Sequence, residues 1–394
     1  MNRTYYDVAI IGGGASGLML AARLNLNGSR GIILEGSARL GSKLLMSGGG
    51  HCNITHAGSI KDFVKAYGEA GPSLRKCLYR HSNEEIVNWL EGLGVPLVDK
   101  NGRVFPASMK AADVLSAFIK KATTNQWHIE TNAFVNELKP ICDDATFKGY
   151  EINLIDRAGI SARNIVIATG GITYPETGSD GSFFHVLESL GVRVTELHAA
   201  LAPVFVKAYP YTELSGLSVQ GVTVNVLDDI DAETKMKKSK GMTGDILFTH
   251  KGFSGPVVLN ISKYVKPGKR LLINYNKALS ELPKRMQSIL TERAKGPSGD
   301  VRTKVLSSLL SGDEFIVSKV DSRGMVTAGG VSLDQIDMRT MQLKNSPSDR
   351  TNALYIIGEA LDIDGITGGY NLQMCFSTAA TAADYLLSII QHNQ

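Results

Sequence analysis

The stretch DVAIIGGGASGLMLAARLNLNG, residues 7–28, decides the fold. Its first five residues are mostly apolar and β-branched, which is typical of a strand buried on both faces. This run leads directly into glycines 12, 14 and 17, which satisfy the pattern GxGxxG. Residues 15–28 predict a helix that ends at a glycine, and GIILE at 31–35 predicts a second strand. The stretch therefore predicts a complete β-α-β dinucleotide-binding unit.

Each glycine of this motif has a physical role. Gly12 allows a tight turn, Gly14 lets a pyrophosphate approach the backbone, and Gly17 lets the helix pack closely on the sheet. The amides at the start of the helix and the positive end of its dipole face the anion. Glu35 ends the second strand and can accept hydrogen bonds from a ribose 2′-OH, whereas its charge repels a 2′-phosphate.

A second glycine run, LLMSGGGHCNIT, occupies residues 44–55. Because no Cβ stands in the way, the backbone amides of residues 47–50 can lie against a planar ring or a phosphate. Lys43 would add a positive charge near the pyrophosphate. The alternative is an ordinary loop beside a solvated lysine.

The second glycine run resembles the signature of the bacterial NAD(P)/FAD-dependent oxidoreductase family that includes the BaiN-type reductases and the aminoacetone-oxidase-like flavoproteins. Four further stretches agree with that family: GRVFPAS at 102–108, IVIATGGITYPETGSDGSFF at 165–184, LFTHKGFSGPVVLNIS at 247–262, and VTAGGV followed by LYIIGEALDIDGITGGYNLQ at 354–373. The resemblance implies FAD as the cofactor. The chain departs from the family at His51, where arginine is usual, and at Met374–Ser377, where tryptophan is usual.

Other expected cofactor contacts follow from buried strands and from the resemblance. The strand near 165 ends beside the adenosine. HIETNAFVNEL at 128–138 predicts another strand, and by the resemblance its backbone near Val135 recognises the adenine edge. Glu359 directly follows a buried strand and would hold ribitol hydroxyls, and the free amides at the start of the last helix would face the flavin N1 and O2 edge. The expected FAD-binding residues are Gly12, Gly14, Ala15, Ser16, Gly17, Glu35, Lys43, Leu44, Ser47, Gly48, Gly49, Asn53, Val135, Ala168, Thr169, Gly170, Gly358, Glu359, Gly369, Tyr370, Asn371 and Leu372.

No catalytic triad or dyad can be identified from the spacing of residues. The candidates for proton transfer are His51, Tyr174 and Asp364, although a single histidine is more often structural than catalytic. Cys52 and Cys375 are expected to be inert buried thiols. The four scattered cysteines have no metal-binding spacing, so we expect no metal site.

The chain has 394 residues and a net charge of +4, which requires no nucleic-acid or membrane partner. No apolar run is long enough to cross a bilayer, and a cytoplasmic location is expected. About 180 residues separate the strands near 165 and 354, so an insertion is expected. The predicted class is α/β, with an FAD-binding Rossmann-like domain of the glutathione-reductase type at 1–195 and 341–394. A β-barrel-like domain at 196–340 is inserted into it. Its short helical piece near 278–312 contains two predicted short helices, at 279–295 and 301–312.

The resemblance implies an FAD-dependent oxidoreductase that transfers hydride through flavin N5. The leading hypothesis is reduction of a small unsaturated or carbonyl substrate, with NADH or NADPH as a transient donor because no second GxGxxG is present. The alternatives are an oxygen-using amino-ketone oxidase and a uridine reductase that acts on ribosomal RNA. The lysine-rich run at 235–241 is more typical of a solvated hairpin tip than of a phosphate-contacting patch. A flavin-binding sensor without turnover is the alternative from a different class.

Overall fold

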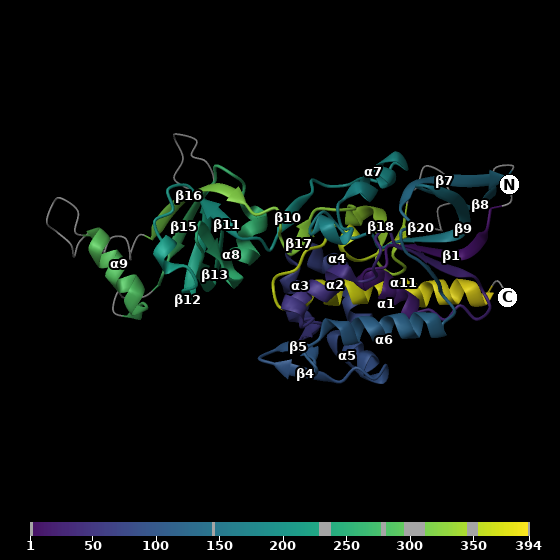
Figure 1. Cartoon of the computed structure of the whole chain (residues 1–394), viewed down its shortest axis with the longest axis horizontal. Coiled ribbons are helices and arrows are strands. Elements are labelled where there is room, and N and C mark those ends of the chain that lie inside the picture. Colours follow the sequence, from purple (N-terminus) through teal and green to yellow (C-terminus); the bar gives the residue numbers. More distant parts are fainter. Residues whose placement is uncertain are drawn as a thin grey trace. The chain divides into compact units, whose positions relative to one another are not determined.

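The computed structural model describes residues 3–143, 146–227, 238–276, 281–294, 312–344 and 354–392. The chain forms two compact units (Figure 1), one made of Met1–Leu197 with Val326–Gln394 and the other of His198–Met325. The first unit is therefore discontinuous in sequence, and the second is inserted into it. The predicted α/β architecture with an inserted barrel is confirmed.

A parallel sheet forms the centre of the first unit. Its strands lie in the order β20, β9, β1, β2, β6. Their bounds are Leu354–Ile356, Arg157–Ile167, Tyr5–Ile11, Gly31–Leu34 and His128–Glu130. The described residues of β2 and β20 are buried throughout, as expected for strands covered on both faces. Short antiparallel strands β18 (Ile336–Asp337) and β19 (Gln342–Leu343) extend the β20 edge.

An antiparallel hairpin joins the same sheet. It consists of β7 (Val135–Asp143) and β8 (Thr146–Leu154), and β8 also pairs with β9. The sequence predicted one strand over 128–138, but the structure divides it into β6 and β7. The division falls at Asn132, whose φ of +53° lies in the left-handed region and turns the chain.

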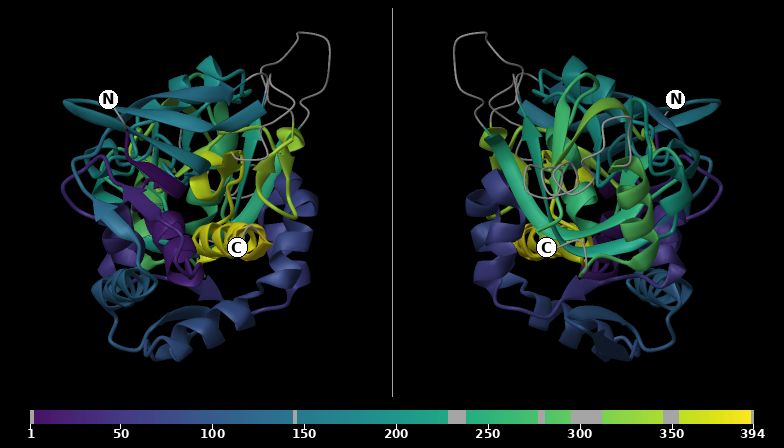
Figure 2. Two further views of the ribbon diagram at one scale, coloured as in Figure 1. Left: turned by 90° about the vertical axis from the view of Figure 1, so that its right-hand side faces the viewer. Right: turned by 90° about the vertical axis from the view of Figure 1, so that its left-hand side faces the viewer.

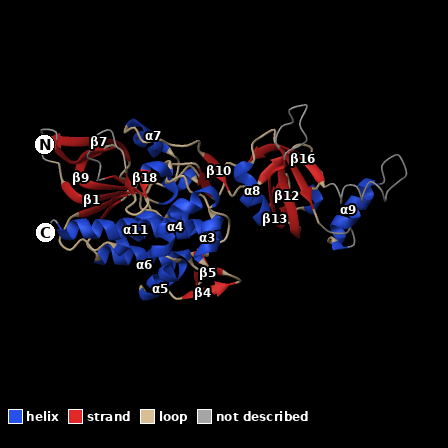
Figure 3. Ribbon diagram, turned by 180° about the vertical axis from the view of Figure 1, so that it is seen from behind, coloured by secondary structure: helices blue, strands red, loops and turns tan. Residues whose placement is uncertain are grey.

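Three helices lie along one side of the parallel sheet (Figure 3): α1 (Ala15–Arg23), α6 (Ala111–Thr124) and α11 (Tyr370–His392). Helix α11 packs directly against α1, and Figure 2 shows the two side by side. The packing is close because the inward face of α11 carries small residues, among them Ala379, Ala380 and Ala383, all buried. This packing brings the start of the last helix near the dinucleotide turn.

The chain between β2 and β6 forms a smaller helical and strand layer. Its helices are α2 (Ser42–Met46), α3 (Ile60–Ala66), α4 (Gly71–Arg80) and α5 (Asn83–Gly92). A three-stranded sheet of β3 (Thr55–His56), β5 (Arg103–Pro106) and β4 (Leu97–Lys100) accompanies them. Ser59 and Ser82 cap α3 and α5, because each hydroxyl accepts a hydrogen bond from an amide in the first turn.

The second unit is a closed barrel of the strands β11, β14, β13, β12, β15 and β16. Their bounds are Val204–Val206, Gly252–Ser254, Lys238–Phe248, Ser218–Leu227, Arg270–Asn274 and Asp313–Val320. Alternate residues of β12, including Val222, Val224 and Val226, are buried. Phe253 fills the interior, with its ring centroid 5.0 Å from that of Phe315 and 5.5 Å from that of Phe248. The alternating apolar pattern of the sequence therefore produces a filled barrel.

Among the described residues of the second unit, α-helices form at α8 (Pro256–Ile261) and α9 (Lys284–Ala294). Helix α9 corresponds to the first of the two short helices predicted within 278–312. The second, predicted over 301–312, lies outside the described residues except for Gly312. Residues 235–237 of the lysine-rich run also lie outside them, and β13 begins at Lys238.

The chain returns to the first unit at Val326, whereas the sequence predicted a return at 341. Val331 forms bridges with Val194 and Leu361, and the Thr327 amide donates a hydrogen bond to Glu359. These contacts tie the segment after 325 to the dinucleotide-binding sheet. A hydropathy pattern does not reveal them, because they are formed by single bridges and loops.

Candidate cofactor and active site

The GxGxxG turn has the close backbone approaches that this pattern requires. Gly12 has a φ of +106°, and a Cβ there would lie 2.4 Å from the carbonyl oxygen of Ala168, at the end of β9. A Cβ at Gly17 would lie 2.0 Å from the Gly12 carbonyl oxygen, so only glycine lets α1 approach the turn. At Gly14 a Cβ would have no heavy atom within 4 Å. The backbone at Gly14 is therefore open to a ligand.

Glu35 is buried beside this turn. Its Oε2 accepts a hydrogen bond from the Gly13 amide and its Oε1 accepts one from the Ser37 amide, both at 2.8 Å. The adjoining chain belongs to the same end of the site, because the Ala133 amide donates to the Glu35 carbonyl oxygen. Val135, two residues further on, is the buried first residue of β7. The two residues expected at the adenosine therefore lie on neighbouring segments.

The second glycine run forms a compact turn, residues Ser47–Gly50. Gly48, Gly49 and Gly50 have φ values of +58°, +69° and +90°, all in the left-handed region. A Cβ at Gly49 would have no heavy atom within 4 Å, whereas one at Gly48 would lie 3.0 Å from the Asn53 amide nitrogen. Successive amides in such a turn form a concave surface that suits an anion or a ring edge.

The start of α11 lies against the chain that follows this loop. With its side-chain oxygen facing Gly369, Asn53 accepts a hydrogen bond from the Gly369 amide and donates one to the Thr55 carbonyl oxygen, both at 3.1 Å. A Cβ at Gly369 would lie 2.5 Å from the Thr55 carbonyl oxygen. Two glycine-rich segments more than 300 residues apart in the sequence thus meet.

A third segment reaches α1 and α11 from the end of β20. Gly358 has a φ of +68°, and a Cβ there would lie 2.0 Å from the Ser16 hydroxyl. The Gly358 amide donates to Thr378 of α11 at 3.0 Å. Ser16 and Gly358, both predicted cofactor contacts, are therefore brought together beside α11.

Lys43 and Glu359 form an ion pair, with the Lys43 ammonium 2.8 Å from the Glu359 carboxylate. Lys43 also donates to the Thr173 hydroxyl at 2.6 Å. The amide and hydroxyl of Thr327 donate to Glu359 Oε1 at 2.8 and 2.9 Å. The contacts of the lysine with the pyrophosphate and of the acid with the ribitol hydroxyls stay predictions, and in the structure the two side chains also pair with each other. Thr173 and Thr327 were missed, although both lie in the quoted family motifs.

The side chains at the start of α11 are engaged with protein. The Tyr370 ring stacks on His56 at 5.3 Å between centroids, and the Tyr67 hydroxyl donates to the Tyr370 carbonyl oxygen at 2.7 Å. The Asn371 side chain bonds the amide and the carbonyl of Gly365 at 2.8 and 3.0 Å. These residues can therefore offer a cofactor their backbone amides, which have no acceptor within the first turn of the helix.

The three proton-transfer candidates lie on three different loops. His51 is exposed, and its Nδ1 lies 2.9 Å from the Met109 carbonyl oxygen. Tyr174 is half-buried and has a φ of +59° in the loop after β9. Asp364 is half-buried and precedes the glycine pair at 368–369.

The two cysteines near the site are buried. Burial raises the pKa of the Cys52 thiol to about 11, and burial likewise raises the pKa of the Cys375 thiol to about 11. Both sulfurs therefore stay protonated near neutral pH, which fits inert thiols. Within the described ranges, no group of three or more His, Cys, Asp or Glu side chains could hold a metal ion. No helix among the described residues is long and apolar enough to span a membrane.

The dinucleotide turn, the open glycine loop and the acid after β20 define the class, a flavoprotein with a Rossmann-like FAD-binding domain. The backbone open at Gly14 and Gly49 fits such a cofactor, because a Cβ would stand in the space it needs. The chain belongs to the family described as HI0933-like protein Rossmann domain, whose model matches residues 6–385. The resemblance seen in the sequence is confirmed.

Similar proteins agree with this class. The chain is 28% identical to a ribosomal RNA dihydrouridine synthase of Haemophilus influenzae, over 96% of this chain and 98% of that protein. It is 26% identical to a 3-dehydro-bile acid delta(4,6)-reductase of Clostridium scindens, over 97% of this chain and 98% of that protein. The structure of a 3-ketosteroid delta1-dehydrogenase from Sterolibacterium denitrificans shares the fold, with a TM-score of 0.56 at 14% identity, covering 98% of this chain and 100% of that one. The protein is an FAD-dependent oxidoreductase.

Proposed function

We propose that this protein reduces a carbon–carbon double bond conjugated with a carbonyl group, with NADH or NADPH as the electron donor. The names of two relatives support this reaction type. Dihydrouridine is a nucleoside whose ring double bond has been saturated beside a carbonyl, and a delta(4,6)-reductase acts on ring double bonds. A small unsaturated molecule is the leading substrate class.

The convergence of three stretches of bare backbone carries this proposal. The turn at Gly12–Gly17, the loop at Ser47–Gly50 and the segment at Gly368–Gly369 all belong to the first unit. In the proposal, Gly14 faces the pyrophosphate, Glu35 holds the ribose, and the backbone near 168–170 and at Val135 contacts the adenosine. Bound FAD would supply hydride transfer at its N5 atom.

The residues of the chain would contribute orientation and charge. The first amides of α11, at Tyr370, Asn371 and Leu372, offer donors and the positive end of a helix dipole. Such donors stabilise negative charge on a neighbouring group, and they cost no reorganisation at the moment of reaction. Lys43 and Glu359 form a hydrogen-bonded ion pair of no net charge in the first unit.

For proton transfer we favour His51. The carbonyl oxygen of Met109 can only accept a hydrogen bond, so Nδ1 of His51 carries the proton in that contact. This leaves Nε2 as the atom that gains or releases a proton. Tyr174 and Asp364 are the alternatives.

Rapid mixing of the purified holoenzyme with NADPH and NADH in the absence of oxygen tests the proposal. We expect the flavin absorbance to bleach at a rate that supports turnover, and to recover when an α,β-unsaturated ketone is added. His51→Ala should slow recovery while FAD stays bound. Consumption of oxygen with an amino ketone, without recovery by the unsaturated ketone, would instead indicate the oxidase. If neither nicotinamide nor an amino ketone bleaches the flavin, the protein is a flavin-binding sensor without turnover.

A specific observation favours RNA as a second substrate candidate. Residues 198–325 contain 19 Lys and Arg against 12 Asp and Glu, a net charge of +7, whereas the remaining chain contains 23 against 26, a net charge of −3. The charge is therefore concentrated in the barrel unit, as expected for a polyanion partner. Binding of ribosomal RNA that weakens steeply with salt would support this substrate, and binding without salt dependence would count against it.

A further inference from the structure

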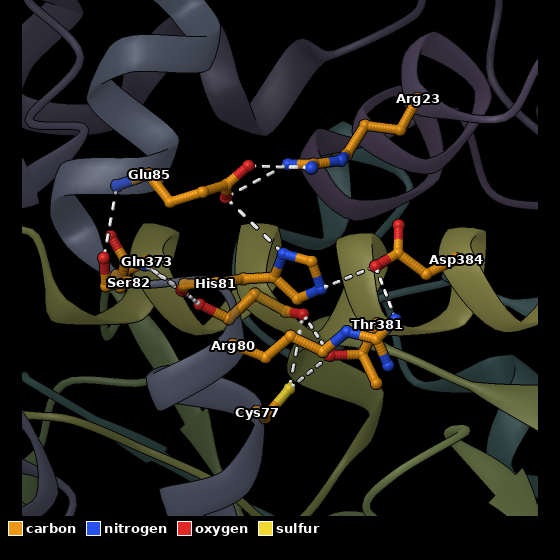
Figure 4. Close-up of polar contacts among 10 residues, drawn as sticks. Arg23, Cys77, Arg80, His81, Ser82, Glu85, Gln373, Thr381 and Asp384 are labelled. Carbon is orange, nitrogen blue, oxygen red and sulfur yellow. Dashed lines mark hydrogen bonds and ion pairs between the residues drawn. The ribbon is translucent and has the colours of Figure 1, made fainter.

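A cluster of partly exposed charged side chains surrounds the buried residue His81, directly after α4 (Figure 4). The imidazole is 3% exposed. Its Nδ1 lies 3.5 Å from the carboxylate of Glu85 on α5, and its Nε2 lies 3.3 Å from that of Asp384 on α11. Arg23 of α1 binds Glu85 through two hydrogen bonds of 3.2 and 2.7 Å, and Arg80 contacts Asp384 at 2.9 Å. The cluster therefore joins four helices.

The carboxylates favour a charged imidazole. Burial alone would lower the pKa of His81, but hydrogen bonding to Asp384 and Glu85 outweighs burial and raises it above the ordinary 6.5. Burial would likewise raise the pKa values of Glu85 and Asp384, but contact with His81 and the arginines lowers both. The carboxylates on either side of the ring therefore favour the protonated form of His81.

The backbone of His81 connects this cluster to the start of α11. Its carbonyl oxygen accepts hydrogen bonds from the Gln373 side-chain amide at 3.1 Å and from the Ser377 hydroxyl at 2.7 Å. Gln373 Oε1 accepts a hydrogen bond from the Thr55 hydroxyl at 2.6 Å. Gln373, Ser377 and Thr55 are fully buried. An unpaired polar atom at this depth is costly, so these bonds fix the geometry of the segments that form them.

Gln373 connects the two segments that meet at the flavin end of the candidate site. It directly follows Leu372, whose amide belongs to the first turn of α11. Thr55 lies two residues after Asn53, on the chain that leaves the glycine loop, and its backbone contacts Gly369. A single side chain therefore bonds the helix start, the strand after the glycine loop and the end of α4.

We propose that Gln373 is a positioning residue, which together with His81 sets the α11 start against the glycine loop at the separation that FAD requires. This inference rests on the proposed placement of the cofactor, but not on the substrate or the reaction. Gln373 and His81 contact no reacting atom in this role. They act through the backbone amides at 370–372 and through Thr55.

The test compares Gln373→Met and Thr55→Val with a matched control, Ser377→Ala. Each of the first two removes the Gln373–Thr55 hydrogen bond. Ser377→Ala removes a bond to the same His81 carbonyl oxygen and the 2.9 Å hydrogen bond that Ser377 accepts from Gln373 Nε2, but it leaves the Gln373–Thr55 hydrogen bond intact. The measurements are the Kd of FAD, the midpoint potential of the bound flavin, and the Tm of the apoprotein.

We expect the Kd of FAD to rise about tenfold in Gln373→Met and in Thr55→Val, with a shifted flavin potential in both. All three variants should lower the Tm of the apoprotein by similar amounts. The Kd of FAD in Ser377→Ala should nevertheless stay within about twofold of the wild-type value. The proposal is overturned if both test variants bind FAD as wild type does. It is also overturned if Kd follows Tm equally in all three variants, because that result shows a structural role only.

A pH series adds an independent readout. We expect the FAD affinity of the wild type to fall as the pH rises through the pKa of His81, because the neutral imidazole no longer attracts Asp384 and Glu85. His81→Gln should remove this dependence, and an unchanged pH profile in that variant would contradict the link to His81. If the wild type binds FAD but reduces no unsaturated substrate, the proposed function fails while these measurements still decide the role of Gln373.

Discussion

The cofactor cradle and the barrel interior are built on opposite principles. The cradle, defined here as Gly12–Gly17, Ser47–Gly50 and Gly368–Gly369, is shaped by missing side chains, because a Cβ at several of its positions would collide with the backbone. The barrel interior is filled by aromatic rings whose centroids lie 5.0 to 6.0 Å apart. Adding a single carbon to a glycine should therefore damage the cradle. Removing several carbons from an aromatic side chain should damage the barrel interior.

The largest effects are expected from substitutions of two cradle glycines, one of which should impair folding and the other FAD binding. Gly17→Ala should prevent stable folding of the first unit, since its Cβ would lie 2.0 Å from the Gly12 carbonyl oxygen. Gly14→Val should fold, because its space is open and its φ of −83° suits any residue. It should nevertheless abolish FAD retention by occupying the space of the pyrophosphate. Circular dichroism and the flavin absorbance of purified protein measure both outcomes. Retention of FAD by Gly14→Val would displace the cofactor from this turn.

The barrel offers the reverse change. Phe253→Ala leaves a cavity among Tyr209, Phe248 and Phe315, whose rings all contact Phe253. We expect a loss of about 3–5 kcal/mol in the free energy of unfolding of the second unit. Denaturant unfolding followed by tyrosine fluorescence measures the loss, and the flavin absorbance should remain. A loss below about 1 kcal/mol would show that the interior collapses to fill the space.

This contrast also explains what the sequence could predict. The cradle glycines stand out in the sequence because GxGxxG and SGGG are local patterns tied to backbone geometry. The parallel strands β2 and β20 were equally legible as short apolar runs. The Lys43–Glu359 pair was not, because its partners are 316 residues apart and each reads alone as a free charge. Thr173 and Thr327 were missed for the same reason, since a hydroxyl gives no sign of its acceptor.

Removing Lys43 should have an intermediate effect. Lys43→Met leaves Glu359 with the donors of Thr173 and Thr327 but without its counter-charge. We expect a loss of about 1–3 kcal/mol in stability, most of it recovered in the double variant with Glu359→Gln, where neither charge remains. Chemical denaturation of the four proteins in a double-mutant cycle gives the coupling energy. Additive losses would show that the pair contributes nothing beyond its separate hydrogen bonds.

The His81 cluster was also invisible in the sequence, because its members come from four helices and none lies in a recognised motif. Each of these charged residues, taken alone in the sequence, is typical of an ordinary solvated charge. The polar bonds that place α11 therefore depend on tertiary packing that no local pattern encodes. Backbone geometry was predictable from glycine spacing, whereas the long-range pairing of side chains was not.

The smallest expected effect is a pH dependence that belongs to the first unit. The pKa of His81 is raised above 6.5, so its contribution to stability is complete below that pH and is lost as the pH rises through the folded-state value. The pKa values of Asp384 and Glu85 are lowered from 3.8 and 4.5, so their contributions are complete above those values and are lost as the pH falls through the folded-state values. The cluster should therefore stabilise the apoprotein most between about pH 4.5 and 6.5.

Urea unfolding of the apoprotein at a series of pH values, from within this range to well above it, measures that effect. His81→Gln should flatten the decline above pH 6.5, because no imidazole remains to lose its proton. Tyr209→Phe, which removes a buried hydroxyl in the barrel, is the matched control and should keep the decline. The cradle presents mainly backbone amides, which do not titrate, so a decline that persists in His81→Gln must arise from other side chains. That outcome would show that the stability of α11 does not depend on the charge of His81. The geometry of the cradle would then depend on packing and not on this charge.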